Sequence, residues 1–251
     1  MINKNQLLSS IFHPRESNIQ KDEKDILVEV ESNTNIGIRL FLKDKKYPCI
    51  IFFHGNGELA QEYDDIAEYY NSYKLNFIVC DYRGYGLSDG NPTKDNLHKD
   101  SRKIFEYINT YLKDNKYTGK IIIMGRSLGS ASACEIIDNY SNNIDGCIIE
   151  SGFATEFSFL KLMQIEPTDI NFKLEDGFMN LEKLKTYKKP LFIIHADLDD
   201  IIPFSQAEMI LIESPSKIKN IFKVNGANHN NIIMIAREEY FIKIKSFIDS
   251  V

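Results

Sequence analysis

The sequence predicts an α/β fold with a mostly parallel central sheet and helices on both faces. Short runs of consecutive apolar residues recur along the chain, as expected of strands that are buried on both faces. Amphipathic segments with helical spacing lie between these runs. The chain has 251 residues, 43% of them hydrophobic, which is enough for the core of one globular domain over residues 1–251.

The N-terminal part predicts an edge hairpin followed by the first buried strand. Residues 1–24 are polar and irregular, and Pro14 prevents a long helix there. Residues 25–32 and 35–43 alternate apolar and polar side chains, which indicates a half-exposed hairpin at an edge of the sheet. Residues 48–53 (PCIIFF) form a continuous apolar run and predict a buried strand.

The middle of the chain predicts alternating helices and strands. Residues 59–73 carry apolar side chains at helical spacing, and residues 77–80 form the next buried strand. Residues 93–114 predict a helix that begins just after a proline. Residues 120–133 predict a central strand and the beginning of a further helix, which runs to about residue 140.

The C-terminal part adds three strands and a final helix. The predicted strands are residues 146–150, 191–195 and 221–224. The final helix has an inward apolar face made of Ile232, Ile235, Tyr240, Phe241, Ile244 and Phe247. Residues 152–189 interrupt the alternation, and we expect them to form a small lid over a fairly open site. Their large apolar residues are Phe153, Phe157, Phe159, Met163, Phe172, Phe178 and Met179.

Charge and composition argue against several kinds of partner. The formal net charge is −6 and no basic stripe is present, so no nucleic acid partner is expected. No apolar run approaches the roughly 18 residues of a membrane-spanning helix, and the N-terminus lacks the pattern of a signal peptide. The four cysteines fall in predicted strands or on a helix face and form no C-x-x-C pair, which indicates buried thiols and a cytoplasmic location.

The central strand leads into the most informative motif of the chain. Residues 125–129 read G-R-S-L-G, with Ser127 at the centre, a buried strand before it and a helix after it. This context predicts a nucleophile elbow, in which the two glycines let strand and helix approach closely around the serine. The alternative is that Ser127 merely caps the helix.

A serine nucleophile needs a base within hydrogen-bond reach. His229 lies in a polar loop just after the last predicted strand, and open α/β sheets place their sites at this edge. It is therefore the best candidate for the base. The other histidines are His13 in the N-terminal segment, His54 and His195 at strand ends, and His98, which we expect to be solvated.

A third group usually orients the base, and it is expected in the loop after residues 191–195. That loop offers Asp197, Asp199 and Asp200, of which we favour Asp199. Glu150, at the end of another central strand, is an alternative acid. The cluster of carboxylates also suggests calcium, but apolar residues interrupt the alternating ligand pattern of a calcium loop.

Two backbone N–H groups are needed to stabilise a tetrahedral oxyanion. Leu128, the residue after the candidate nucleophile, is expected to provide one. The second is expected from the loop that follows residues 48–53, which reads H-G-N-G, and Asn56 is the best candidate. The alternative for this loop is a plain glycine turn.

The order of the motifs HGNG, DYRGYG, GRSLG, D-x-x-I-P and NH resembles the α/β-hydrolase superfamily. Within it, the chain is similar to the group of Bem46-like proteins and α/β-hydrolase domain 13 and 17 proteins, from about residue 45 onwards. The most specific run is residues 81–86, which is followed by Ser88, Gly90 and Pro92. Two departures are Ala196, where the group usually has glycine, and Asn228, where glycine is common.

The resemblance implies the α/β-hydrolase fold, a site and an activity. It implies Ser127, Asp199 and His229 as a catalytic triad, with Asn56 and Leu128 at the oxyanion hole and no metal or cofactor. The expected activity is a serine hydrolase that cleaves a small-molecule carboxylic ester or thioester through an acyl-enzyme. The alternatives are hydrolysis of a peptide or amide bond by the same triad, and a non-catalytic binding protein on this fold.

Overall fold

The computed structural model describes residues 4–162 and 164–251. Within these residues eight strands form one sheet, in the order β1-β2-β4-β3-β5-β6-β7-β8. The strands are β1 (Asp25–Glu31), β2 (Thr34–Phe41), β3 (Cys49–Phe53), β4 (Asn76–Cys80), β5 (Ile121–Arg126), β6 (Gly146–Glu150), β7 (Leu191–Ala196) and β8 (Lys219–Val224). Pairing is antiparallel between β1 and β2 and between β2 and β4, and parallel from β4 through to β8. The mostly parallel α/β sheet is thereby confirmed.

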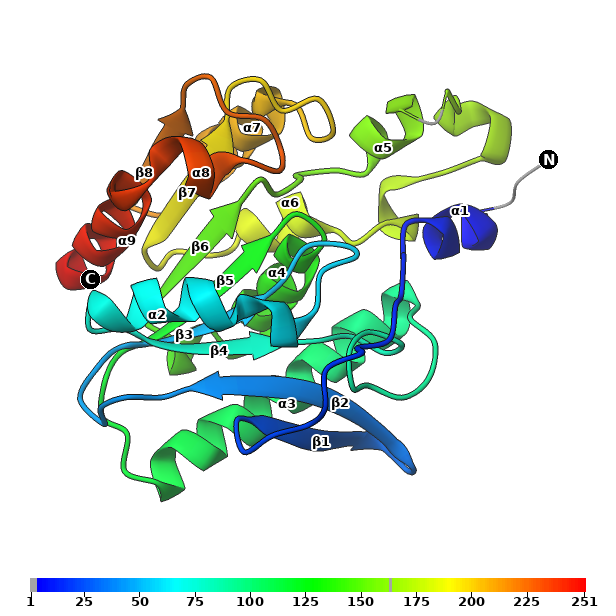
Figure 1. The fold of residues 1–251 in the computed structure, drawn as a ribbon. Coiled ribbons are helices and arrows are strands. Elements are labelled where there is room, and N and C mark those ends of the chain that lie inside the picture. Colours follow the sequence, from blue (N-terminus) through cyan, green and yellow to red (C-terminus); the bar gives the residue numbers. More distant parts are fainter. Residues whose placement is uncertain (1–3, 163) are drawn as a thin grey trace.

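Helices cover both faces of this sheet (Figure 1). They are α1 (Lys4–Ser10), α2 (Asp64–Ser72), α3 (Lys94–Asp114), α4 (Gly129–Tyr140), α5 (Phe157–Leu162), α6 (Asn180–Leu184), α7 (Phe204–Glu213), α8 (Ile232–Ala236) and α9 (Glu238–Ser250). Shorter 3₁₀ turns are η1 (Ala60–Tyr63), η2 (Ser141–Asn143), η3 (Pro167–Ile170) and η4 (Leu174–Asp176).

Two hydrophobic cores lie on opposite faces of the sheet. One packs the sheet against α3, α4, α6 and α7, and the other packs it against α2, α8 and α9. Successive residues of a strand point to opposite faces, so Ile123 of β5 belongs to the first core and its neighbours Ile122 and Met124 belong to the second. Burial on both faces explains why β3, β4, β6 and β7 are apolar almost throughout.

Several local predictions differ from the structure. The expected single C-terminal helix is divided into α8 and α9 at Arg237, where φ is 52°, and Ile235 is exposed rather than inward. The structure also contains α1, in a segment that we expected to be irregular, and α7, which we did not predict. The hairpin lies at one edge of the sheet as expected, with β1 outermost.

Residues 152–162 and 164–189 form a cover that packs around aromatic side chains. Phe153 contacts Phe159 and Phe178, with ring centroids 5.0 and 5.7 Å apart. The N-terminal segment lies beside this cover (Figure 1): Phe12 packs edge-on against Phe178, with ring centroids 6.4 Å apart. The cover therefore packs against a segment from a distant part of the sequence. Met163 lies outside the described residues.

His98 does not have the solvated environment that we expected. Its imidazole packs against Phe178 of the cover, with ring centroids 5.8 Å apart, and its Nε2 lies 3.3 Å from Lys183 Nζ. Burial, together with the Lys183 charge, lowers the pKa of His98 to about 4. The expectation was wrong because the neighbours of His98 come from a segment that is distant in the sequence.

The cysteines are buried as expected, and the helices can be compared with the length that is needed to span a membrane. Cys49, Cys80, Cys134 and Cys147 are buried and free. In the part of the chain that the structure describes, every helix is too short or too polar to cross a bilayer.

Candidate active site

Ser127 lies at a sharp turn between β5 and α4. Its backbone has a φ of 50°, in the left-handed region that non-glycine residues rarely adopt. The flanking glycines permit this turn: a Cβ on Gly129 would lie 1.9 Å from the Phe53 carbonyl oxygen, and a Cβ on Gly125 would lie 2.3 Å from the Gly129 carbonyl oxygen. The Ser127 N–H donates to the Glu150 carbonyl at 2.9 Å, which attaches the turn to the neighbouring strand.

The structure brings Ser127, His229 and Asp199 together from three loops at the carboxyl edge of the sheet. His229 Nε2 lies 2.9 Å from Ser127 Oγ, and His229 Nδ1 lies 2.7 Å from Asp199 Oδ2. All three side chains are buried. This is the spatial order of nucleophile, base and orienting acid.

Asp199 is held by the backbone of its own loop. Its Oδ1 accepts the N–H groups of Ile201 and Ile202 at 3.0 and 2.7 Å, which leaves Oδ2 directed at His229. Burial alone would raise the pKa of Asp199, but the hydrogen bonds from His229 and Ile202 lower it below its usual value. The carboxylate is therefore ionised at neutral pH and able to accept the His229 Nδ1 proton.

The alternative acids have other partners. Asp197 Oδ1 accepts the Gly226 N–H at 2.7 Å, and Asp200 is exposed. Glu150 accepts the Tyr240 hydroxyl proton at 2.5 Å. Among the carboxylates considered from the sequence, Asp199 is the one that is hydrogen-bonded to His229.

The other histidines, all of which lie in the described residues, have no hydrogen bond to Ser127. His54 is buried and contacts Asp81, with Nε2 3.0 Å from Oδ1. His195 donates from Nε2 to the Ile202 carbonyl at 2.7 Å, and burial lowers its pKa. The neutral His195 ring thus supports the loop that carries Asp199.

The histidine loop tolerates asparagine at residue 228. Asn228 is not among the residues with a positive φ, whereas Gly226 has a φ of 77°. The Asn228 N–H donates to Asn231 Oδ1 at 2.7 Å. A glycine is therefore not required immediately before His229.

Asn56 and Leu128 both line the cavity that contains Ser127 and His229, whose volume is about 520 Å³. Leu128 directly precedes the first residue of α4, where backbone N–H groups lack helical partners. The Asn56 side chain is fixed from two directions: its Oδ1 accepts the His13 N–H at 2.9 Å and the Tyr85 hydroxyl proton at 2.6 Å.

Part of the cavity wall comes from residues that we did not assign to the site. The N-terminal segment contributes Ser10, Ile11 and His13, and the remaining apolar wall is formed by Phe159 and Ile201. The sequence does indicate that the N-terminal segment packs against the protein. Its apolar residues have helical spacing in an otherwise polar segment: Leu7, Leu8, Ile11 and Phe12. The N-terminal segment therefore contributes to the wall of the candidate site.

Known proteins support the same fold. A model of the family described as serine aminopeptidase, S33, matches residues 44–163. The human α/β-hydrolase domain-containing protein 17B is 26% identical over 238 residues, which cover 90% of this chain and 76% of that protein. The Caenorhabditis elegans α/β-hydrolase domain-containing protein aho-3 is 28% identical over 203 residues. That alignment covers 80% of this chain but only 57% of the worm protein.

Solved structures agree in architecture. An esterase from Pyrococcus furiosus superimposes with a TM-score of 0.74 at 18% identity, over 95% of this chain and 98% of that chain. Est1E from Butyrivibrio proteoclasticus, with ferulic acid bound, superimposes with a TM-score of 0.73 at 17% identity, over 90% of this chain and 98% of that chain. The chain is therefore similar to the α/β-hydrolase domain-containing protein 17 group, and the solved structures confirm the expected α/β-hydrolase fold.

Proposed function

We propose that the protein is a serine hydrolase in which Ser127 is the nucleophile, His229 the base and Asp199 the group that orients the base. The observation that carries the proposal is the continuous chain from Ser127 Oγ to His229 Nε2 at 2.9 Å and from His229 Nδ1 to Asp199 Oδ2 at 2.7 Å. A serine hydroxyl becomes a useful nucleophile only with such a base in hydrogen-bond reach.

The Asp199 carboxylate determines which nitrogen of His229 carries the proton. Because it accepts a hydrogen bond from His229 Nδ1–H, the lone pair of Nε2 faces the Ser127 hydroxyl. Ser127 Oγ attacks the acyl carbonyl as its proton moves to His229 Nε2. The imidazolium then protonates the leaving group, whose bond to the acyl carbon breaks. Water then attacks the acyl-enzyme while His229 takes its proton. The acid is released as His229 returns the proton to Ser127.

The oxyanion of each tetrahedral intermediate requires preorganised donors. We assign this role to the backbone N–H groups of Leu128 and Asn56, because both residues line the cavity together with Ser127. Fixation of the Asn56 side chain by Tyr85 and His13 supports the assignment, because it holds the backbone of this loop in place before substrate arrives.

The cavity favours a carboxylic ester or thioester with a short to medium acyl chain. Ile11, Phe159 and Ile201 provide an apolar wall, and a volume of about 520 Å³ suits a small molecule. The structural similarity to the P. furiosus esterase and to a monoacylglycerol lipase from Paleococcus ferrophilus is consistent with this class.

Amide hydrolysis is the second candidate, because the matching family is described as serine aminopeptidase. An aminopeptidase needs an acidic group to bind the α-ammonium of its substrate. Within the described part of the chain, the residues that line the cavity include no aspartate or glutamate. This lining favours the ester or thioester over the aminoacyl amide.

The test is a substrate series with the purified protein. We expect turnover of p-nitrophenyl esters and acyl thioesters, with a maximum of kcat/KM at a short to medium chain, and little turnover of aminoacyl p-nitroanilides. Faster cleavage of the anilides would replace the ester proposal with the amide alternative. Absence of turnover of both series by a folded protein would favour a non-catalytic binding protein.

A further inference from the structure

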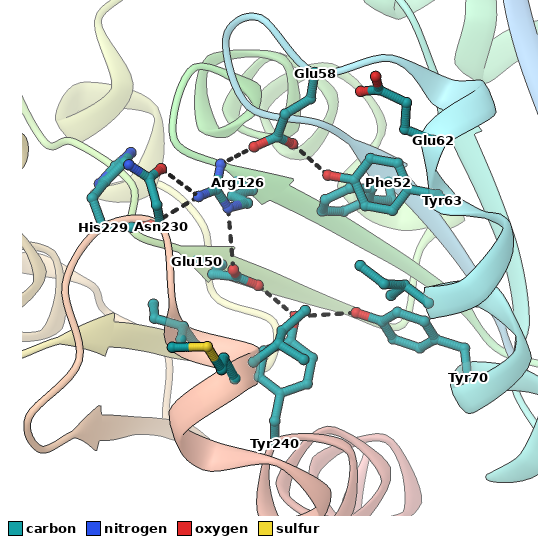
Figure 2. A pocket seen from close by; sticks show the side chains of 14 residues that line it. Phe52, Glu58, Glu62, Tyr63, Tyr70, Arg126, Glu150, His229, Asn230 and Tyr240 are labelled. Carbon is teal, nitrogen blue, oxygen red and sulfur yellow. Dashed lines mark hydrogen bonds and ion pairs between the residues drawn. The ribbon is translucent and has the colours of Figure 1, made fainter.

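Arg126, the residue before Ser127, joins two cavities and three loops. Its side chain is largely buried, with 14% exposed, and it separates the cavity of Ser127 from a second cavity of about 470 Å³ between α2 and α8. Figure 2 shows the guanidinium at the centre of its contacts, with Glu58 on one side, Glu150 on another and the His229–Asn230 segment on a third.

The first set of contacts reaches the histidine loop. Arg126 Nη2 donates to the carbonyl oxygen of His229 at 2.8 Å and to Asn230 Oδ1 at 3.3 Å. The imidazole of His229 extends from the same residue whose carbonyl is bound. A displacement of this carbonyl therefore changes the distance from His229 Nε2 to Ser127 Oγ.

The second set reaches the loop of Asn56 through Glu58. Arg126 Nη1 pairs with Glu58 Oε1, and Glu58 Oε2 accepts the Gly55 N–H at 2.8 Å. The guanidinium also packs directly on Gly55, because a Cβ there would lie 2.3 Å from Arg126 Nη1. Gly55 immediately precedes Asn56, so the ion pair constrains the peptide from which the Asn56 N–H projects.

The charges of this pair are stable in the protein. Burial alone would raise the pKa of Glu58, but the charge of Arg126 and the hydrogen bonds from Tyr63 and the Gly55 N–H, among other contributions, together lower it. Burial opposes the charge of Arg126, but the Glu58 and Glu150 carboxylates raise its pKa. Burial raises the pKa of Glu150, which also accepts the Tyr240 hydroxyl proton. The guanidinium is thus the cation around which both acidic groups are arranged.

We propose that Arg126, anchored by Glu58, is a positioning residue that sets the His229 loop and the Asn56 loop relative to Ser127. This inference rests on the serine hydrolase function proposed above. Arg126 is the last residue of β5 and leads directly into the elbow, so one side chain links the nucleophile turn to the loops of the base and of an oxyanion donor. A planar fork can serve several acceptors in fixed directions, whereas a lysine ammonium acts as a single point charge.

Arg126→Lys tests the proposal because it keeps the charge beside Glu58 and removes the fork. A shift of about 1 Å in a catalytic group reduces the rate by roughly 10²-fold, so we expect kcat to fall by about that factor. KM should change less than about threefold, because the apolar wall that binds the acyl group is intact. A role in folding alone would lower the melting temperature without this separation of kcat from KM.

Two further variants sharpen the test. Glu58→Gln keeps an acceptor for the Gly55 N–H and removes the ion pair, and it should lower kcat by a smaller factor than Arg126→Lys. Arg83→Lys is the matched control: Arg83 is also largely buried and forms a two-bond pair with Asp100 at 2.7 and 2.9 Å, but it does not line the Ser127 cavity. Its kcat should equal that of the wild type.

Each result decides between the alternatives. A folded Arg126→Lys variant with kcat within threefold of the wild type would overturn the positioning role, and so would a change confined to KM. An equal loss of kcat in Arg83→Lys would also overturn the positioning role, because replacing any buried, paired arginine by lysine would then have the same effect. If the wild type itself neither hydrolyses acyl substrates nor reacts with a serine-directed probe, the proposed function fails first and the inference with it.

Discussion

Replacement of Asp199 by asparagine should disable the site through the tautomer of His229 rather than through a loss of shape. In the wild type, Asp199 Oδ1 is bound by two backbone N–H groups, from Ile201 and Ile202, and Oδ2 accepts from His229 Nδ1. In Asp199→Asn, the amide oxygen will stay with the two N–H donors, because an NH₂ group cannot accept from them. The NH₂ group must then face His229.

This orientation reverses the proton order along the triad. An NH₂ group that faces His229 Nδ1, 2.7 Å away in the wild type, donates to it and places the imidazole proton on Nε2. That proton then points at Ser127 Oγ, so the ring can no longer remove the serine proton. Loss of the correct tautomer reduces kcat by about 10⁴-fold in a serine triad, which corresponds to about 5 kcal/mol of transition-state stabilisation.

The assay is steady-state hydrolysis of the best ester or thioester, with Asp200→Asn as the matched control. Asp200 lies next to Asp199 in the same loop and is exposed, so its amide variant should retain wild-type kcat. A loss of less than tenfold in a folded Asp199→Asn variant would refute the reasoning. An equal loss in both variants would refute it as well, because the effect would then belong to the loop and not to the His229 contact.

Two other predictions concern the framework of the site. His98→Gln should make the stability of the protein less sensitive to acid. In the wild type, His98 has a pKa of about 6.5 in the unfolded chain but of about 4 in the folded chain. The free energy of unfolding therefore falls by about 2 kcal/mol because of this group between pH 7 and pH 5. Urea unfolding at both pH values will measure this, and an unchanged pH dependence in His98→Gln would contradict the assigned burial. Gly129→Ala should destabilise the protein by about 1–3 kcal/mol and lower kcat, because its Cβ would meet the Phe53 carbonyl. Wild-type stability and kcat in that variant would contradict the close approach of α4 to β3.

The strands could be predicted because burial on both faces makes their sequences continuously apolar. Residues 48–53 and 191–195 could be predicted as strands without reference to any distant residue, and the observed strands span residues 49–53 and 191–196. α7 was missed because Met209, Ile210, Leu211 and Ile212 are consecutive, which hides the helical period, and Ile212 is in fact exposed. The sequence around Arg237 contains no proline or glycine that would indicate the break between α8 and α9.

The sheet topology predicts where the candidate site residues lie, but it does not predict the hydrogen-bond partners of their side chains. Parallel strands end at one edge, so the loops that hold Ser127, Asp199 and His229 had to lie near each other. The choice among the aspartates depends on which side chain the backbone N–H groups orient, and a one-dimensional pattern does not contain that information. The N-terminal wall of the cavity and the partners of Arg126 likewise depend on contacts between distant segments.

The most direct test of the central claim is labelling of the purified protein with a fluorophosphonate probe, which forms a covalent bond with an activated serine. The proposal predicts rapid labelling of the wild type at Ser127 and its loss in Ser127→Ala, while the variant keeps the wild-type fold. Absence of labelling in a folded wild-type protein would contradict the proposal. Equal labelling of Ser127→Ala would contradict it too, since the reactive group would then lie elsewhere.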